Sequence, residues 1–283
     1  MNIGFIGLGN MGLPMARRLL EKSGCPVYGF DIVPAALEKL AAAGGTPEPD
    51  SAALLEKSDV IFLSLPSNEL VQANLEAAVQ HCRSGAVVVD TSSSVPAVIQ
   101  RCAAPAAARG VELIDCPVSG GVDGAEKGTL SAMCGGSETA LARVSPLLAC
   151  FAARVTHMGS LGSGYAAKLI NNLIVGGEIT LIAEALGLAR KAGLDMARLL
   201  EALSGGAASS PVLSLKGGRM ISGDYTPSSR VLIHLKDQRN AQELARALGA
   251  DIPACDLSTA LLGQLADMGR GGEDVAALID LFA

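Results

Sequence analysis

The first half of the chain alternates short apolar runs with stretches whose apolar residues recur at helical spacing. The runs show little internal alternation and end mostly at Gly, Pro or Asp, which is typical of parallel strands covered on both faces. The stretches between them, such as residues 12–22 and 34–43, predict helices that complete repeated strand–helix–strand units. The predicted strands are residues 3–6, 27–30, 60–65, 87–89 and 111–114, with a further pair near 131–134 and 155–157.

The pattern becomes helical after Gly164. Residues 165–191 contain no Pro and predict one helix about 40 Å long. This segment is apolar on most faces, so we expect it to be buried between other elements. Its charged residues Lys168, Glu178 and Glu184 argue against a membrane span. Further helices are predicted at residues 195–203, 211–221, 234–248 and 257–268.

Together these patterns predict an α/β fold with two domains. Residues 1–162 are expected to form an N-terminal doubly wound domain. Residues 163–283 are expected to form an all-helical C-terminal domain, joined to the first by the long helix. Apolar residues make up 49% and charged residues 18% of the chain, so a large core is expected and disorder is not.

Charge and cysteine usage exclude several classes of protein. The net charge is −6 and no basic run occurs, so we expect no nucleic-acid partner. The seven Cys include no CxxC pair, which argues against a disulfide framework or a zinc site and suits a cytoplasmic location. The N-terminus lacks the basic region of a signal peptide, and no run of about 18 uncharged apolar residues predicts a membrane span.

A glycine-rich motif follows the first predicted strand and opens the first predicted helix. In G-x-G-x-x-G the first Gly allows a tight turn, the second lets the backbone approach a pyrophosphate, and the third lets the helix pack on the strand. The N-terminus of the helix then presents N–H groups to the phosphates. The predicted cofactor-binding turn is Gly7, Leu8, Gly9, Asn10, Met11 and Gly12.

Asp31 directly follows the second predicted strand. It stands about 20 residues after the glycine-rich motif, where a conserved acid binds the adenosine ribose in dinucleotide-binding folds. A carboxylate there accepts hydrogen bonds from the ribose hydroxyls and repels a 2′-phosphate. Ile32 and Val33 follow it, and no Arg is nearby. We therefore expect NAD rather than NADP as the cofactor. The alternative is a structural Gly-rich turn with an Asp that caps the next helix.

Two later stretches carry candidate chemistry. After Asp115, the loop Ser119-Gly120-Gly121 has few side chains to compete for its backbone N–H groups, so it can hold a carboxylate; the alternative is an ordinary turn. Lys168 and Asn172 lie four residues apart and share a face at the start of the long helix. A buried lysine is a candidate general acid or base; the alternative is a lysine whose amine reaches solvent.

Four motifs, GFIGLGNMG, DCPVSGG, GSGYAAKLINN and HLKD, occur in this order over essentially the whole chain. Together they resemble the β-hydroxyacid dehydrogenase family, whose members include 3-hydroxyisobutyrate dehydrogenase and tartronate semialdehyde reductase. The resemblance implies a Rossmann domain that binds NAD and a helical domain for substrate binding and oligomerisation. It also implies a homodimer or homotetramer.

The resemblance implies roles for individual positions. Lys168 matches the catalytic lysine, which accepts the hydroxyl proton as hydride leaves and returns it in the reverse reaction. No metal is required. Lys236, in HLKD, matches a lysine near both nicotinamide and substrate. The other cofactor-binding positions implied are Leu65, Pro66 and Ser93, and the substrate-binding positions are Ser119, Gly120, Gly121 and Asn172.

The substrate is indicated by two further stretches. Residues 204–213 read SGGAASSPVL and residues 229–237 read SRVLIHLKD, and both resemble tartronate semialdehyde reductase more than 3-hydroxyisobutyrate dehydrogenase. Small side chains in the first stretch leave room for a polar substrate and little apolar wall for a methyl group. We therefore expect tartronate semialdehyde (2-hydroxy-3-oxopropionate), with 3-hydroxyisobutyrate and threonate or another sugar acid as alternatives. Gln238-Arg239 departs from the family's pattern and bears on fine substrate geometry.

The sequence argues against three other classes of protein. A non-catalytic NAD-binding scaffold and an imine reductase on the same fold would both be expected to lack the lysine present at position 168. A 6-phosphogluconate dehydrogenase has a longer helical domain than the roughly 120 residues available here.

Overall fold

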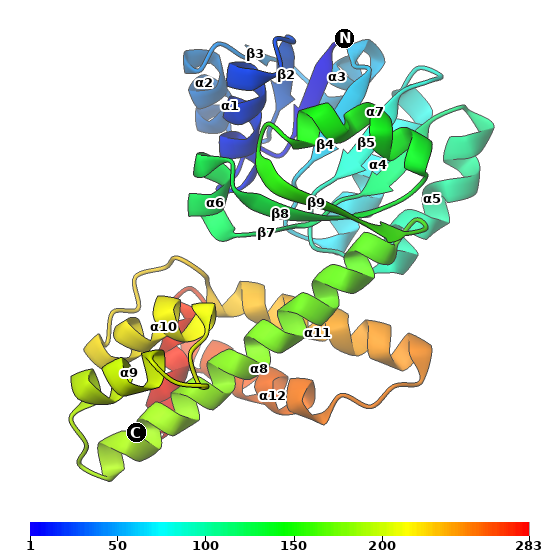
Figure 1. Cartoon of the computed structure of the whole chain (residues 1–283). Coiled ribbons are helices and arrows are strands. Elements are labelled where there is room, and N and C mark those ends of the chain that lie inside the picture. Colours follow the sequence, from blue (N-terminus) through cyan, green and yellow to red (C-terminus); the bar gives the residue numbers. More distant parts are fainter. Residues whose placement is uncertain (283) are drawn as a thin grey trace. The chain divides into compact units, whose positions relative to one another are not determined.

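The computed structural model describes residues 1–282, which fall into two compact units (Figure 1). Unit 1 comprises Met1–Lys168, and unit 2 begins at Leu169. Each unit has its own apolar core, and each is described by itself.

Unit 1 contains a nine-stranded sheet. Its order is β3-β2-β1-β4-β5-β6-β8-β7, and β9 pairs with β8. The six strands β1 to β6 are parallel to one another, whereas β8 runs antiparallel to β6 and β7. The strands are β1 (Ile3–Ile6), β2 (Val27–Phe30), β3 (Thr46–Pro47), β4 (Val60–Leu63), β5 (Val87–Asp90), β6 (Glu112–Asp115), β7 (Val118–Ser119), β8 (Leu130–Gly135) and β9 (Ala152–Gly159).

This strand order confirms the predicted doubly wound fold. The chain builds outward from β1 to β3 and then returns to the other side of β1 with β4, so the order reverses between β1 and β4. In sheets of this kind, ligands bind outside the carboxyl ends of the strands at the point of reversal. The predicted bounds of β1 and β2 are confirmed to the residue, and β4 ends two residues before its predicted end.

Seven helices connect the strands of unit 1. Several begin where the sequence supplies an N-cap: the side chains of Asp50, Ser67 and Ser137 each accept a hydrogen bond from a backbone N–H in the first turn of their helix. Phe5 and Phe62 stack in the core between sheet and helices, and Phe151 packs edge-on against Phe62. The helices are α1 (Gly12–Lys22), α2 (Pro34–Ala42), α3 (Ser51–Lys57), α4 (Asn68–His81), α5 (Pro96–Ala108), α6 (Gly121–Lys127) and α7 (Glu138–Leu148).

Among the described residues of unit 2 the regular elements are all helices, apart from an isolated β-bridge between Arg230 and Asp274. The long helix α8 (Ser163–Lys191) begins in unit 1 and supplies Ile179, Ala183 and Leu186 to the core of unit 2. A single π-helical turn (Ala266–Arg270) and a 3-10 helix (Val275–Phe282) follow the last α-helix. The other helices are α9 (Met196–Ser204), α10 (Pro211–Ser222), α11 (Val231–Leu248) and α12 (Pro253–Leu265).

The expectation that α8 is buried between other elements is wrong for one face of this helix. Ile170, Ile174, Leu181 and Leu188 are each more than half exposed in the single chain. These four residues recur at helical spacing, so they form one apolar stripe, while the opposite face packs into the cores. By length and composition α8 could cross a membrane, but its buried residues make it a core helix of a folded protein.

Candidate active site

The predicted site residues of unit 1 follow the carboxyl ends of neighbouring parallel strands. The glycine-rich turn follows β1, Asp31 follows β2, Leu65 and Pro66 follow β4, and Ser93 follows β5. Because the carboxyl ends of parallel strands lie at one edge of a sheet, the structure brings these residues to the same edge.

The three glycines of the turn differ in what surrounds them. Gly7 has a φ of +91°, and a Cβ there would collide with the carbonyl of Ser64; a Cβ on Gly12 would collide with the carbonyl of Gly7. At Gly9, by contrast, an added Cβ would meet no atom within 4 Å. The helix α1 then begins without a side-chain cap. This cradle, open at Gly9 and ending at a helix N-terminus, fits the pyrophosphate of a dinucleotide.

Asp31 ties the end of β2 to this turn. Its Oδ2 accepts a hydrogen bond from the N–H of Leu8 at 2.6 Å, and its Oδ1 accepts one from the N–H of Val33 at 2.8 Å. Each carboxylate oxygen can accept more than one hydrogen bond, so both keep capacity for ribose hydroxyls. Ile32, beside it, is 87% exposed. Asp31 therefore fits the adenosine end of a nicotinamide dinucleotide.

The loops after β4 and β5 are joined by a hydrogen bond. The N–H of Leu65 donates to Oγ of Ser92 at 2.8 Å. A second bond runs from Oγ of Ser94 to Oδ1 of Asn68, the first residue of α4. Ser93 lies half-buried between these two serines, and Pro66 is exposed. The two segments predicted to contact the cofactor are thus held together.

The predicted carboxylate-binding loop has a backbone that requires glycine. Ser119 ends β7 and pairs with Ser131 of β8, which fixes the start of the loop. Gly120 and Gly121 have φ values of +132° and +64°, in the region that side chains rarely adopt. Both are exposed, and a Cβ on Gly121 would meet no atom within 4 Å. The loop therefore presents backbone to solvent, as an anion cradle requires.

The start of α8 is held by two carboxylates that the sequence reasoning missed. Asp115 accepts hydrogen bonds from the N–H groups of Gly162, at 2.7 Å, and Tyr165, at 2.8 Å. The Tyr165 hydroxyl donates to Oδ2 of Asp90. Lys168, one turn further on, is only 8% exposed. The sequence signal that could have found them is an Asp at the end of each of two neighbouring apolar strands, Asp90 after β5 and Asp115 after β6, because an acid there must be buried and needs partners.

Burial dominates the electrostatics of these two carboxyl groups. It raises the pKa of Asp90 to about 6, although hydrogen bonds from Ser92 and Tyr165 favour the ionised form. It also raises the pKa of Asp115, against the backbone N–H groups of Gly162 and Tyr165. The Cys116 thiol, next to Asp115, is fully buried 3.1 Å from the Cys134 thiol, which agrees with a packing role.

In unit 2, Asp237 brings together two predicted substrate-binding residues. The Asn172 side-chain amide donates to Oδ2 of Asp237 at 2.8 Å, and the Lys236 ammonium lies 3.2 Å from its Oδ1. Gln238, which departs from the family's pattern, is fully buried and donates to the carbonyl of Asn172 at 2.7 Å. The sequence reasoning missed Asp237, although it stands beside Lys236. The role of Lys236 toward the cofactor stays a prediction.

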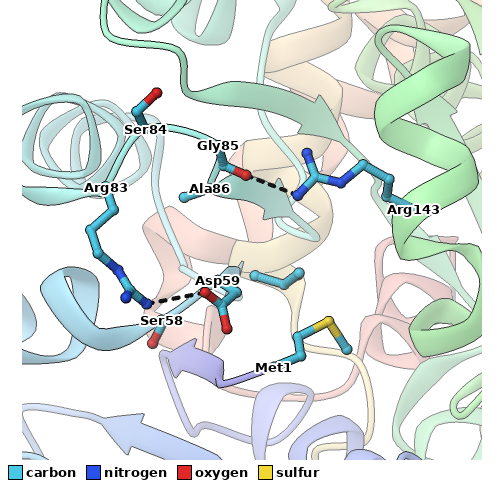
Figure 2. Close-up of a pocket in the computed structure, with 9 residues that line it drawn as sticks. Met1, Ser58, Asp59, Arg83, Ser84, Gly85, Ala86 and Arg143 are labelled. Carbon is cyan, nitrogen blue, oxygen red and sulfur yellow. Dashed lines mark hydrogen bonds and ion pairs between the residues drawn. The ribbon is translucent and has the colours of Figure 1, made fainter.

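A separate pocket lies at the opposite edge of the sheet, at the amino ends of β1, β4 and β5. Figure 2 shows Arg83 reaching Asp59 and Arg143 reaching the carbonyl of Gly85. The Arg83–Asp59 contact is 3.1 Å long, and Arg143 donates to the Gly85 carbonyl at 2.8 Å. These contacts tie the segments that precede β4 and β5 to each other and to α7, so we assign them a structural role. Within residues 1–282, no three His, Cys, Asp or Glu side chains come together as a possible metal site.

Comparison with known proteins identifies the class. Residues 2–159 match the family described as the NAD binding domain of 6-phosphogluconate dehydrogenase. Residues 162–282 match the family described as NAD-binding of NADP-dependent 3-hydroxyisobutyrate dehydrogenase. The fold and these matches define a nicotinamide-dependent oxidoreductase that uses NAD or NADP.

Relatives over the full length give the family. The chain is 36% identical to 2-hydroxy-3-oxopropionate reductase of Escherichia coli, covering 99% of this chain and 96% of the relative. It is 35% identical to 2-(hydroxymethyl)glutarate dehydrogenase of Eubacterium barkeri, covering 100% and 95%. A structure of Mycobacterium tuberculosis 3-hydroxyisobutyrate dehydrogenase with L-serine matches with a TM-score of 0.91 at 30% identity, covering 99% and 98%. The chain belongs to the β-hydroxyacid dehydrogenase family and is an oxidoreductase acting on CH–OH groups.

Proposed function

We propose that this enzyme transfers a hydride between NAD(H) and tartronate semialdehyde (2-hydroxy-3-oxopropionate), with glycerate as the reduced product. The observation that carries the hydroxy-acid chemistry is Lys168, a lysine only 8% exposed on the first turns of α8, in the family's catalytic position. A scaffold without catalysis would have no need for a buried amine there, because burying a lysine costs free energy.

The roles of the residues follow from their chemistry. When bound, the nicotinamide accepts or supplies the hydride. The backbone of Ser119, Gly120 and Gly121 holds the substrate carboxylate, which orients the hydroxyl carbon. Lys168 accepts the hydroxyl proton in oxidation and donates a proton to the carbonyl oxygen in reduction, and its charge stabilises the developing alkoxide. Asn172, hydrogen-bonded to Asp237, and Lys236, ion-paired with it, supply further polar contacts to the substrate.

Asp31 supports NAD as the preferred cofactor. Its carboxylate stands at the end of β2, where a 2′-phosphate would be repelled, and the exposed side chains that follow it, Ile32 and Val33, carry no charge. The cofactor contacts proposed are those of the glycine-rich turn, Asp31, Leu65, Pro66, Ser93 and Lys236.

The choice of substrate rests on the loop between α9 and α10. Residues 205–210 are Gly, Ala and Ser only, and they offer no apolar wall to a methyl group. The 36% identity to the Escherichia coli reductase points the same way. The second candidate is 3-hydroxyisobutyrate, favoured by the structural match to the Mycobacterium tuberculosis enzyme, and a threonate-type sugar acid is the third.

A substrate panel tests this proposal. NADH consumption would be followed with tartronate semialdehyde, methylmalonate semialdehyde, succinic semialdehyde and glyoxylate, and NAD reduction with glycerate, 3-hydroxyisobutyrate, threonate, L-serine and 2-(hydroxymethyl)glutarate. The highest kcat/KM is expected with tartronate semialdehyde. A higher value for 3-hydroxyisobutyrate would contradict the polar-pocket argument, and no turnover of tartronate semialdehyde would contradict the proposed substrate.

The wider organisation is proposed on the same basis. Residues 1–162 serve as the NAD-binding domain, and residues 163–283 serve substrate binding and assembly into a homodimer or homotetramer. The exposed apolar stripe on α8 supports assembly, because a stripe of this length is costly to leave in water. We also propose a cytoplasmic location, since the seven cysteines are free.

A further inference from the structure

Two buried carboxylates stand side by side at the carboxyl edge of the sheet. Asp90 is the last residue of β5 and Asp115 the last residue of β6, and the two are direct partners in the parallel ladder. Both side chains are fully buried. Burying two neighbouring carboxylates costs free energy unless each accepts hydrogen bonds, so the donors that bind them indicate the role of the pair.

Both carboxylates bind the same residue of α8. Asp115 accepts from the backbone N–H of Tyr165 and from that of Gly162, which satisfies N–H groups that a helix start leaves without partners. Asp90 accepts from the hydroxyl at the other end of the Tyr165 side chain. The fully buried Tyr165 is therefore held at its backbone by one strand end and at its phenol by the next.

The second oxygen of Asp90 leads to the loops predicted to bind the cofactor. Its Oδ1 accepts from the N–H of Ser92 at 2.9 Å, and Oγ of Ser92 accepts from the N–H of Leu65 at 2.8 Å. A continuous path of hydrogen bonds thus runs from Tyr165 through Asp90 and Ser92 to Leu65. It connects the first turn of α8 to the segments after β5 and β4.

Lys168 follows Tyr165 by three residues and lies on the same side of α8, one turn further along. We propose that Tyr165, held between Asp90 and Asp115, is a positioning residue that fixes the turn carrying Lys168 relative to the cofactor-binding loops. Displacements of about 1 Å in a reacting geometry can lower rates about 100-fold, so this anchoring bears directly on turnover. The inference rests on the proposed function, because it takes Lys168 as the acid–base group.

The anchoring depends on the ionisation of Asp90. The titratable groups brought against it are Asp115 on β6, Tyr165 on α8 and the Cys116 thiol that follows β6. Burial raises the pKa of Asp90 to about 6, and the charge of Asp115 acts in the same direction. When Asp90 is protonated, one of its oxygens carries a hydrogen, so the group can no longer accept from both Tyr165 and Ser92 as the carboxylate does. The positioning is therefore largely present at pH 7, half lost at about pH 6 and largely lost at pH 5.

The test compares Tyr165→Phe with Tyr225→Phe. Tyr225 also donates its hydroxyl to a carboxylate, Asp280 at 2.6 Å, but it belongs to unit 2 and has no bond to the turn that carries Lys168. The rate of semialdehyde reduction is measured from pH 5 to 8. In this direction Lys168 must be protonated, so a fall in kcat toward low pH does not come from that lysine.

In the wild type, kcat is expected to fall below about pH 6. In Tyr165→Phe the plateau of kcat is expected to fall about tenfold with the KM for NADH unchanged. Its acid limb is expected to move up by about one pH unit, because the lost hydrogen bond favoured the ionised carboxylate. Tyr225→Phe is expected to keep the wild-type profile. In Asp90→Asn the rate is expected to be low and the acid limb absent.

Melting temperatures separate positioning from unfolding. The pKa of Asp90 is higher in the folded chain than in the unfolded chain, so this group makes the fold more stable as the pH falls from 7 to 5. A melting temperature that falls together with kcat over this range would overturn the inference. So would a flat wild-type profile, an acid limb retained in Asp90→Asn, or a Tyr165→Phe profile that superposes on the wild type. An active Lys168→Ala variant would instead refute the proposed function.

Discussion

Replacing Gly9 by Ala tests the cofactor cradle without disturbing the fold. The φ of Gly9 is not positive and an added Cβ would meet no atom within 4 Å, so the folded chain accepts Ala. Such a change stabilises a protein by about 0.4–1 kcal/mol, because Ala has fewer conformations to lose on folding. The same Cβ, however, occupies the space through which the pyrophosphate approaches the backbone.

The expected loss of affinity follows from the hydrogen bonds between backbone and phosphate. One hydrogen bond to a charged group contributes about 1.5–3 kcal/mol, which corresponds to about a 10- to 100-fold increase in Kd for NADH. The chain contains no Trp, so binding is followed by the fluorescence of NADH itself or by calorimetry. Stability is measured by thermal unfolding of the protein without cofactor.

Gly218→Ala is the matched control for this experiment. Gly218 lies in α10, has open space around its Cβ position and has no role in the cradle, so the variant should keep the wild-type Kd. Gly12→Ala provides the contrast, since its Cβ would collide with the carbonyl of Gly7 and destabilise the fold. A Kd for Gly9→Ala within about twofold of the wild type, a difference of only about 0.4 kcal/mol, would refute the reasoning.

Two further predictions concern charge. Asp31→Asn keeps an acceptor for the N–H of Leu8 but removes the negative charge that repels a 2′-phosphate. The preference for NAD, measured as kcat/KM with NAD divided by kcat/KM with NADP, should therefore fall at least about tenfold. A wild type that prefers NADP would contradict this reasoning. Lys216→Met leaves the fully buried Asp274 without the ammonium that lies 2.8 Å away. Urea unfolding should then show a free energy of unfolding lower by about 3–5 kcal/mol. In the control Lys127→Met, which breaks the exposed pair with Asp123, the loss should be about 0.5 kcal/mol or less. Burial opposes ionisation of Asp274, but hydrogen bonds from Lys216 and Ser228 outweigh burial and lower the pKa of this carboxyl group. The ion pair therefore stabilises the fold at neutral pH, and this contribution should be lost as the pH falls below about 4. Equal melting temperatures for Lys216→Met and the wild type at pH 7 would contradict the assignment.

The elements set by local pattern could be predicted from the sequence. β1 and β2 agree to the residue because each is a short apolar run between turn residues, and α1 begins at the last Gly of the cofactor motif. The two-residue strands β3 and β7 could not be predicted, because two residues carry no periodicity and their pairing depends on neighbours in space.

The parts of the site that sequence reasoning missed depend on contacts between distant segments. Asp90 and Tyr165 are 75 residues apart, and Asn172 and Asp237 are 65 apart, so no local spacing connects them. The exposed stripe on α8 was missed for another reason. Periodicity finds the apolar faces of a helix, but it does not say whether a face is covered by the same chain or by another.

The measurement that tests the central claim most directly is the turnover of Lys168→Ala. NADH consumption with tartronate semialdehyde at pH 7 would be compared with the wild type, together with NADH binding by fluorescence. The account predicts that NADH binds with the wild-type Kd while turnover falls by about 100-fold or more, the range of general acid–base catalysis. Turnover retained within about tenfold, a change in barrier of only about 1.4 kcal/mol, would contradict the role of Lys168 as the acid–base group.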